Sequence, residues 1–354
     1  MSRTKQSTQP TPATQARTAH RPRTLLAMAP TVWEEFSSPG VEARLRGLVA
    51  TPDGLDPLAV VQDIVSAPDL ADVEVLLTGW GTPHLGPEIL ARMPRLRAVI
   101  HTAGSVKHLV SDACWERGLV VSSAVEENAI PVGEYTLAAI LFAQKRVLET
   151  SRLYRQERGT LPWAAQFESL GNYGRVVGIV GASRIGRRVI ELLRPFDMRV
   201  LLSDPYVDAA EARRLGVELV ELDELVARSD TVSLHAPDLP QTRHLIDERR
   251  LGLMRTGSVL INTARGALVD TDALTAELVS GRLHAVIDVT EPEVLPAESP
   301  LYDLPNVLLT PHIAGSLGGE LARLVDHALD ELERYGAGLG FTSPVQRELL
   351  NQSA

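Results

Sequence analysis

The sequence has little cysteine, little lysine and no long apolar run. Its one cysteine, Cys114, excludes an internal disulfide framework and predicts a protein of the reducing cytoplasm. Lysine occurs only at positions 5, 107 and 145, so chemistry that depends on several lysines is excluded. No stretch reaches the roughly 18 consecutive apolar residues of a transmembrane helix, and we therefore expect no membrane span.

The composition is that of a two-domain globular protein. The 354 residues are enough for two domains, and a hydrophobic content of 44% supports two cores. The net charge of −10, spread along the chain, argues against a nucleic-acid surface. Residues 1–23 contain Thr, Gln, Ser, Pro and Arg with almost no large apolar side chain, which predicts a disordered tail, with a transit peptide as the alternative.

The segment from residue 174 to residue 204 has the pattern of a nucleotide-binding unit. Val176–Val180 is a short apolar run typical of a buried parallel strand. Gly181 and Gly186 bracket the turn that follows, apolar residues then recur at helical spacing, and Asp204 ends a second strand. Strand, glycine turn, helix, strand and acid in this order predict that a helix N-terminus faces the pyrophosphate of a dinucleotide.

The acid at the end of the second strand favours NAD over NADP. Asp204 follows the last glycine at about the 20-residue distance of such units, and its carboxylate can accept hydrogen bonds from both ribose hydroxyls. It would repel a 2′-phosphate, and Pro205 and Tyr206 supply no cation. Ser183 replaces the middle glycine, and we expect it either to push the pyrophosphate outward or to give it a hydroxyl donor.

Strands and helices alternate on both sides of this unit. Four strands are predicted before it, at residues 24–28, 73–77, 96–101 and 119–122, and further strands follow it up to residues 307–309. The alternation predicts an α/β protein with two doubly wound parallel sheets, in which ligands bind outside the carboxyl ends of the strands. A long helix from Pro131 to about Tyr154 is the predicted connector between the two domains.

Three polar residues each follow a separate apolar strand of the nucleotide-binding sheet: Arg265, Glu293 and His312. Because the carboxyl ends of parallel strands meet at one edge, we expect these side chains together beside the cofactor. Arg can bind a carboxylate with its fork and polarise the neighbouring carbonyl. His can protonate the oxygen as hydride reaches carbon, and Glu can fix the imidazole tautomer. The three types suit hydride transfer to a 2-oxo acid.

With these residues the chain resembles the D-isomer-specific 2-hydroxyacid dehydrogenase family, over about residues 24–335. The motifs that carry the resemblance are Val-Gly-Ile-Val-Gly-Ala-Ser-Arg-Ile-Gly at 177–186, Ser-Asp-Thr-Val-Ser-Leu-His-Ala-Pro at 229–237, Ile-Asn-Thr-Ala-Arg-Gly-Ala-Leu-Val-Asp at 261–270, Asp-Val-Thr-Glu-Pro-Glu at 288–293 and Thr-Pro-His-Ile-Ala-Gly at 310–315. The resemblance implies a flavodoxin-like substrate domain (residues 24–145 plus 316–354) around an inserted Rossmann-like NAD domain (residues 146–315). It also implies a homodimer built through the NAD domains, and no metal.

The resemblance also assigns roles to single residues. It implies Arg265, Glu293 and His312 as the catalytic set, and it selects Glu293 over Glu291 by its spacing from Asp288. The substrate would contact Gly104, Ser105, Val106 and Trp80, although Trp80 could equally be a plain core aromatic. The cofactor would contact Gly181, Ser183, Arg184, Ile185, Gly186, Asp204, His235, Pro237, Thr242, Thr263, Ala264, Arg265, Asp288, His312 and Gly315.

The chain departs from the family pattern at a few positions. The loop that usually reads Gly-x-Gly-Val-Asp is Ala103-Gly104-Ser105-Val106-Lys107 here, so Lys107 either makes the substrate pocket more cationic or points to solvent. Val294 stands where a Pro often follows the Glu, and Ser183 replaces a Gly. The absence of Gln at position 293 disfavours the related formate dehydrogenases.

Three functions are compatible with this pattern. The first is an NAD-dependent enzyme that interconverts a 2-oxo acid and a D-2-hydroxy acid, with the acid and the direction left open. The second is a non-enzymatic NAD-sensing module, like the corepressors that share the fold, which would show NAD-dependent partner binding without turnover. The third is oxidation of another anion such as phosphite, which the scarcity of lysine makes less favourable.

Overall fold

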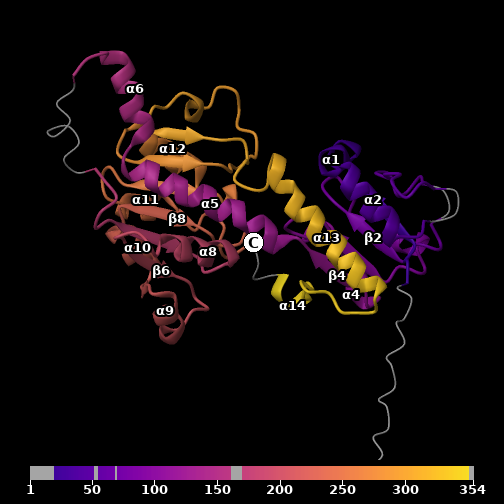
Figure 1. Ribbon diagram of the computed structural model, residues 1–354. Coiled ribbons are helices and arrows are strands. Elements are labelled where there is room, and N and C mark those ends of the chain that lie inside the picture. Colours follow the sequence, from indigo (N-terminus) through magenta and orange to yellow (C-terminus); the bar gives the residue numbers. More distant parts are fainter. Residues whose placement is uncertain (1–19, 52–54, 68–69, 161–169, 351–354) are drawn as a thin grey trace, which may run out of the picture.

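A computed structural model describes residues 20–51, 55–67, 70–160 and 170–350. Two parallel sheets, each covered by helices, lie side by side and are joined by a long helix (Figure 1). The predicted α/β architecture with two parallel sheets is therefore confirmed. Of the predicted tail, residues 1–19 lie outside the described residues. For residues 20–23 the prediction is wrong, because the N–H of His20 donates to the Gly336 carbonyl (2.9 Å) and the Arg21 side chain donates to the Val49 carbonyl (2.7 Å).

The first sheet is short, parallel and buried on both faces. Its strands, in spatial order, are β1 (Thr24–Ala27), β2 (Val75–Thr78), β3 (Ala98–His101) and β4 (Val120–Ser123). Isolated parallel bridges at Ala50 and Val60 extend the sheet beyond β1. Every strand residue except Val120 is buried and most are apolar, as two-sided coverage by helices requires. The covering helices are α1 (Pro30–Phe36), α2 (Pro39–Leu48), α3 (Pro87–Arg92) and α4 (Asp112–Glu116).

One face of this sheet is completed by a helix from the other end of the chain. Helix α13 (Leu321–Gly336) packs against α2 and β3 (Figure 1). Its Leu324 and Leu329 are buried in the same core as Leu26 and Ile100. The segment that builds the second sheet is thus inserted between two parts of the first domain. The domain limits of residues 24–145 plus 316–354 and of residues 146–315 stay a prediction.

The second sheet contains seven parallel strands whose order reverses in the middle. Reading across the sheet, they are β11 (Val307–Leu309), β10 (His284–Ile287), β9 (Val259–Asn262), β8 (Thr231–Leu234), β5 (Val176–Val180), β6 (Arg199–Ser203) and β7 (Glu218–Leu219). The chain runs outward in opposite directions from β5 and β8, so a crevice opens at the carboxyl ends of these two strands. This is where a dinucleotide binds in such sheets.

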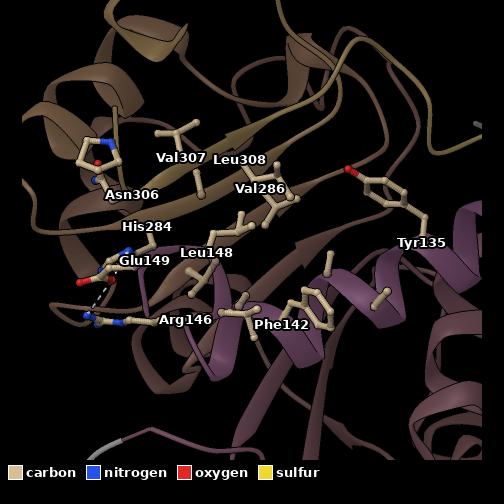
Figure 2. A pocket seen from close by; sticks show the side chains of 17 residues that line it. Tyr135, Phe142, Arg146, Leu148, Glu149, His284, Val286, Asn306, Val307 and Leu308 are labelled. Carbon is tan, nitrogen blue, oxygen red and sulfur yellow. Dashed lines mark ion pairs between the residues drawn. The ribbon is translucent and has the colours of Figure 1, made fainter. Parts of the chain in front are cut away.

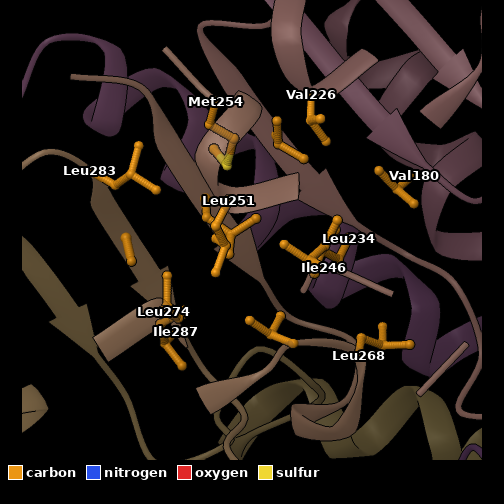
Figure 3. Close-up of a cluster of buried hydrophobic side chains, with 14 of the residues drawn as sticks. Val180, Val226, Leu234, Ile246, Leu251, Met254, Leu268, Leu274, Leu283 and Ile287 are labelled. Atoms are coloured by element: carbon orange, nitrogen blue, oxygen red, sulfur yellow. The ribbon is translucent and has the colours of Figure 1, made fainter. Parts of the chain in front are cut away.

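Helices cover both faces of the second sheet. They are α8 (Arg184–Leu193), α9 (Ala209–Leu215), α10 (Leu222–Arg228), α11 (Glu248–Leu253) and α12 (Thr271–Val279). On one face the side chains of Leu234, Leu251, Met254 and Ile287 meet in a core that α10, α11 and α12 close (Figure 3). This core fixes the strands whose carboxyl ends carry the polar side chains described below.

The connector helix differs from the prediction at both ends. Helix α5 (Val125–Gln144) begins six residues before Pro131, and a second helix, α6 (Val147–Glu157), follows it. Pro131 removes one N–H donor but does not prevent a helix that tertiary packing holds on both sides, since Pro131 and Val132 are buried. The two helices are separated at Arg146, whose φ of 46° is left-handed. None of the helices in the described parts of the chain has the length and hydropathy needed to cross a membrane.

An apolar groove lies between this connector and the edge of the second sheet. Its lining includes Tyr135, Phe142, Leu148, Val286 and Leu308, and it encloses about 170 Å³ (Figure 2). Phe142 and Leu148 are exposed over 57% and 48% of their surfaces. Strand β11, which forms one wall, is the last strand of the sheet. Among the described residues, the second domain therefore carries an exposed apolar surface beside the last strand of its sheet.

Candidate active site

A cavity of about 1020 Å³, called the cleft below, lies between the two sheets. The first domain lines it with the loops that follow β2 and β3. The second domain lines it with the turn after β5 and with the segments after β9, β10 and β11, while α5 contributes its first turns. The cleft therefore lies at the carboxyl ends of the strands of both sheets, where open parallel sheets bind ligands.

The turn after β5 is packed so closely that two of its positions need glycine. Gly181 has a left-handed φ of 95°, and a Cβ there would lie 2.7 Å from the Ala236 nitrogen. A Cβ at Gly186 would lie 2.1 Å from the Gly181 carbonyl oxygen, so both positions need glycine. Ser183 caps α8, because its Oγ accepts the Gly186 N–H at 3.3 Å. Ser183, Arg184 and Ile185 line the cleft, so the N-terminus of α8 is presented to a ligand.

Asp204 is held beside this turn by its own hydrogen bonds. Its Oδ2 accepts the Ala182 N–H at 2.7 Å, and its Oδ1 accepts the Tyr206 N–H at 2.8 Å. A carboxylate oxygen has two lone pairs, so each oxygen keeps an acceptor site for a ribose hydroxyl. A glycine cradle beside a fixed carboxylate fits the pyrophosphate and ribose of NAD.

His312 and Glu293 form a close pair. The imidazole Nδ1 lies 2.6 Å from Glu293 Oε1, and the two side chains are exposed over 49% and 61% of their surfaces. Glu293 does not line the cleft, whereas His312 does. A carboxylate on Nδ1 fixes the tautomer in which Nδ1 carries the proton. The ring nitrogen left for a substrate is therefore Nε2.

The loop that carries His312 is anchored by Asp288. The buried Asp288 carboxylate accepts hydrogen bonds from Thr310 Oγ1 (2.6 Å), Ile313 N–H (2.8 Å) and Ala314 N–H (2.9 Å). The His312 N–H donates to the Asp288 carbonyl at 2.8 Å, and His312 itself has a left-handed φ of 56°. Asp288 also lines the cleft, so it both fixes the loop and faces a ligand. An acceptor position on Oδ2 remains for an amide such as that of nicotinamide.

Arg265 enters the cleft half-buried, and no carboxylate oxygen of the described residues lies within ion-pair distance of its guanidinium. In the described parts of the chain its guanidinium makes one hydrogen bond, from Nη1 to the Ala264 carbonyl at 2.6 Å. Burial lowers the pKa of Arg265, and the charges of Asp238 and Glu293 oppose that effect. Asn262 holds the backbone of this loop, since its Nδ2 donates to the Arg265 carbonyl at 2.9 Å. A fixed cation with free donors is suited to bind an anion.

The predicted substrate residues divide into two groups. Gly104 and Ser105 line the cleft, while the Val106 side chain is buried in the core of the first domain and can offer only its backbone. Trp80 lines the cleft, is 41% exposed, and stacks on Phe36 with ring centroids 5.7 Å apart. Trp80 is therefore a wall of the cleft rather than a core aromatic.

Several predicted cofactor residues do not present their side chains to the cleft. His235 is buried with its Nε2 2.9 Å from Ser233 Oγ, and burial lowers its pKa to about 3. Thr242 Oγ1 donates to the Pro237 carbonyl at 2.6 Å and accepts the Leu239 N–H at 2.9 Å. Ala264 is also buried, whereas Thr263 and Gly315 line the cleft. For His235, Pro237, Thr242 and Ala264, cofactor contact through the backbone stays a prediction.

Sequence reasoning missed three residues of the cleft. Asn128 lies on α5 with its amide beside Gly104 and Gly315, and its Oδ1 accepts the Ser316 N–H at 3.1 Å. His101 ends β3 with its Nδ1 3.0 Å from Thr78 Oγ1, and burial lowers its pKa to about 4. Ser316 is buried with no partner for its hydroxyl among the described residues. His101 could have been found from the sequence, because it is a polar residue at the end of a predicted strand. Asn128 could not, because it precedes the residue at which its helix was predicted to begin.

Comparison with known proteins shows which family the chain resembles. The sequence model of the family described as D-isomer specific 2-hydroxyacid dehydrogenase, NAD binding domain, matches residues 137–314. D-3-phosphoglycerate dehydrogenase of Methanocaldococcus jannaschii is 33% identical over 70% of this chain and 47% of that protein. Glyoxylate reductase of Korarchaeum cryptofilum is 33% identical over 73% of this chain and 78% of that protein.

A solved structure has the same arrangement of two sheets. D-lactate dehydrogenase from Aquifex aeolicus, complexed with NAD and lactic acid, superposes with a TM-score of 0.70 at 27% identity, covering 89% of this chain and 96% of that one. The chain spans only about half the length of the first curated relatives it matches, 47% and 43%. The similarity therefore covers the two domains described here and leaves other parts of those longer relatives unmatched.

Proposed function

Since the chain belongs to the D-isomer-specific 2-hydroxyacid dehydrogenase family, we propose that it interconverts a 2-oxo acid and a D-2-hydroxy acid with NAD as the hydride carrier. The observation that carries this proposal is the composition of the cleft. The half-buried Arg265 and the His312–Glu293 pair approach it from neighbouring strands, on the same edge as the glycine turn. The relatives named above are a dehydrogenase and a reductase, which supports an enzyme rather than an NAD-sensing module.

Each side chain has a distinct role in the proposed reaction. Bound NADH supplies a hydride to C2 of the 2-oxo acid. Arg265 binds the substrate carboxylate with its free donors and polarises the C2 carbonyl. The proton that completes the hydroxyl comes from His312 Nε2, and solvent returns it through the exposed side of the ring. Glu293 holds the imidazole and stabilises its charged form. In the reverse direction His312 takes the hydroxyl proton.

The cofactor preference rests on Asp204. Its carboxylate is negatively charged, and backbone N–H groups hold both of its oxygens in place. It is therefore unfavourable for binding a phosphate. We therefore expect NADH to be used in preference to NADPH, since a 2′-phosphate would lie against a carboxylate.

The test is a steady-state assay with a matched pair of histidine variants. NADH oxidation is followed with glyoxylate, pyruvate, hydroxypyruvate, phenylpyruvate and a branched-chain 2-oxo acid. His312→Asn should lower kcat by about 100- to 10,000-fold, because the proton donor is lost. NADH affinity should change by less than about twofold. His244→Asn is the control, because His244 also has a left-handed φ, which Asn tolerates, and does not line the cleft.

Two outcomes would contradict the proposal. If His312→Asn weakens NADH binding as much as it lowers turnover, His312 is a cofactor ligand and not the proton donor. If no 2-oxo acid is reduced while NADH binds tightly, the chain is not a reductase of this substrate class. In that second case, partner binding that depends on NADH would favour the sensing module.

We also propose a homodimer and a cytoplasmic location. A second copy is the proposed occupant of the apolar groove beside β11, because Phe142 and Leu148 are exposed there, next to a strand that ends the sheet in the described parts of the chain. The buried free thiol of Cys114 is compatible with a reducing compartment.

A further inference from the structure

His101 is a buried histidine of the cleft to which the proposed reaction gives no role. It is the last residue of β3 and pairs in register with Thr78 at the end of β2, so it lies where the loops after both strands begin. The residue is only 5% exposed, and it lines the cleft. Its Nδ1 lies 3.0 Å from Thr78 Oγ1, and within the described parts of the chain its Nε2 makes no hydrogen bond. Nε2 is therefore the polar atom that this ring offers to a ligand.

The contacts of Thr78 fix the tautomer of this ring. The Thr78 hydroxyl has one proton, and its Oγ1 lies 3.2 Å from the Ile100 carbonyl oxygen, which can only accept. Both contacts of Oγ1 are hydrogen bonds only if the hydroxyl donates to Ile100 and the ring donates from Nδ1. Burial lowers the pKa of His101 to about 4, so the ring holds a single proton at neutral pH. Because that proton is on Nδ1, Nε2 is a lone-pair acceptor.

An acceptor in this place differs from the groups that suit the acid end of a 2-oxo acid. The Arg265 guanidinium can only donate. The Asn128 amide accepts the Ser316 N–H on Oδ1 at 3.1 Å, which leaves its Nδ2 as a donor to the cleft. Both of these groups suit carboxylate and carbonyl oxygens, whereas the lone pair of His101 Nε2 would repel them. The ligand group that His101 can bind is therefore one that carries a proton.

We propose that His101 is a specificity-determining residue whose Nε2 accepts a hydrogen bond from a hydroxyl group on C3 of the substrate. The inference rests on the proposed function, because the proton of the C2 hydroxyl belongs to His312 in that reaction and C3 is the next carbon that can carry a donor. A methyl group on C3 would leave the buried acceptor without a partner, and a phosphate ester there would place acceptor oxygens against it. The selection is therefore for a donor and not for charge.

The first experiment measures binding without turnover. The NADH complex of the full chain is titrated calorimetrically with D-glycerate and with D-lactate, which have the same charge and differ only by the hydroxyl on C3. Both acids are already reduced, so they do not react with NADH. D-glycerate should bind at least about tenfold more tightly, because D-lactate places a methyl group against a buried acceptor that then has no partner.

The variants assign this preference to one ring nitrogen. His101→Phe keeps a ring and removes the acceptor, so it should bring the two affinities to within about threefold of each other. Thr78→Val keeps the imidazole and removes the hydroxyl that fixes its tautomer, so the proton can move to Nε2 and the preference should fall by at least about threefold. Thr78 is not among the residues that line the cleft. His84→Phe is the matched control at an exposed position of the first domain and should keep the full preference.

The outcomes separate this inference from the proposed function. Equal affinity for D-glycerate and D-lactate in the unmodified chain would overturn the inference, and so would a full preference that survives either His101→Phe or Thr78→Val. The same loss in His101→Phe and His84→Phe would overturn it too. Reduction of pyruvate and hydroxypyruvate with equal kcat/KM would leave the proposed function standing alone. A preference for D-glycerate that depends on His101, in a chain that reduces no 2-oxo acid, would keep the hydroxyl site and reject the reductase.

Discussion

At the scale of single residues, the proposed catalytic pair of His312 and Glu293 includes a carboxylate that is exposed to solvent. Glu293 is 61% exposed, yet its Oε1 lies 2.6 Å from His312 Nδ1. A neighbouring acid, Glu291, instead pairs with Arg243 at 2.8 Å. The two acids therefore differ in partner although they are almost adjacent in sequence, and only one of them acts on the imidazole.

Glu293→Gln should lower kcat by about 10- to 100-fold. A Gln can still contact the ring but cannot stabilise its charged form, and the loss should be smaller than the ~10⁴-fold loss of a buried triad acid because water also reaches this position. Glu291→Gln is the control and should stay within about twofold of the unmodified chain, which steady-state kinetics would measure. Equal losses in both variants would mean that the local charge matters and the Glu293–His312 contact does not.

At the scale of elements, the strands were easier to predict than the helices. Val176–Val180 and Val259–Asn262 are apolar on both faces, so their composition alone indicates buried parallel strands. Helix α5 was predicted to begin at Pro131 because proline favours a first turn. Its true start at Val125 lacks a side-chain cap, so the local sequence gives no sign of it. Because the helix start was missed, Asn128 was not recognised as a residue of the cleft. Its position there depends on contacts with residues distant in sequence.

The same elements show which site residues local sequence could predict. Arg265, Glu293 and His312 follow strands, and strand order fixes the edge at which they meet. His235 also follows a strand, but its ring turns into the core, which depends on packing that the sequence does not reveal. For Lys107 the sequence left two orientations open; its side chain is half-buried and is not among those that line the cleft.

Helices α5 and α13 are joined by a buried histidine between acids. His327 Nδ1 lies 3.0 Å from Glu127 Oε1, and its Nε2 lies 3.7 Å from Glu331 Oε1. Burial lowers the pKa of His327, but the hydrogen bond to Glu127 and the charges of Glu127, Glu331 and Asp330 outweigh burial and raise the pKa. Glu331 also accepts the N–H groups of Thr342 (2.9 Å) and Ser343 (2.9 Å), so the cluster fastens the C-terminal segment.

Stability should therefore fall as the pH rises above neutrality. Because the folded pKa of His327 is raised, its contribution is complete below the unfolded value of about 6.5 and is lost as the pH passes through the folded value. Urea unfolding of the unmodified chain and of His327→Gln, compared between pH 6 and pH 8.5, should show a difference that shrinks by about 1 kcal/mol with rising pH. His84→Gln, at an exposed site, should show no such change. A difference independent of pH would indicate a packing role alone.

At the scale of the whole molecule, the apolar groove beside β11 is the proposed interface of a homodimer. Phe142→Glu would place a charge in the groove and should convert a dimer to a monomer, with the transition seen by sedimentation velocity. Val65→Glu is the control, since Val65 is an exposed apolar residue of the first domain. A chain that is monomeric before any substitution, or a dimer that survives Phe142→Glu, would contradict the proposed interface.

The position of α13 also affects how the chain folds while it is being synthesised. The seven-stranded sheet is built from one continuous stretch, so it can form as soon as that stretch has left the ribosome. The first sheet cannot be completed at that time, because Leu324 and Leu329 belong to its core and are synthesised after the second sheet. The side chains of Leu26 and Ile100 therefore lack their α13 contacts while the second domain is being synthesised. The first domain, although its synthesis begins before that of the second, is therefore completed after it, and its apolar core surface stays exposed for longer.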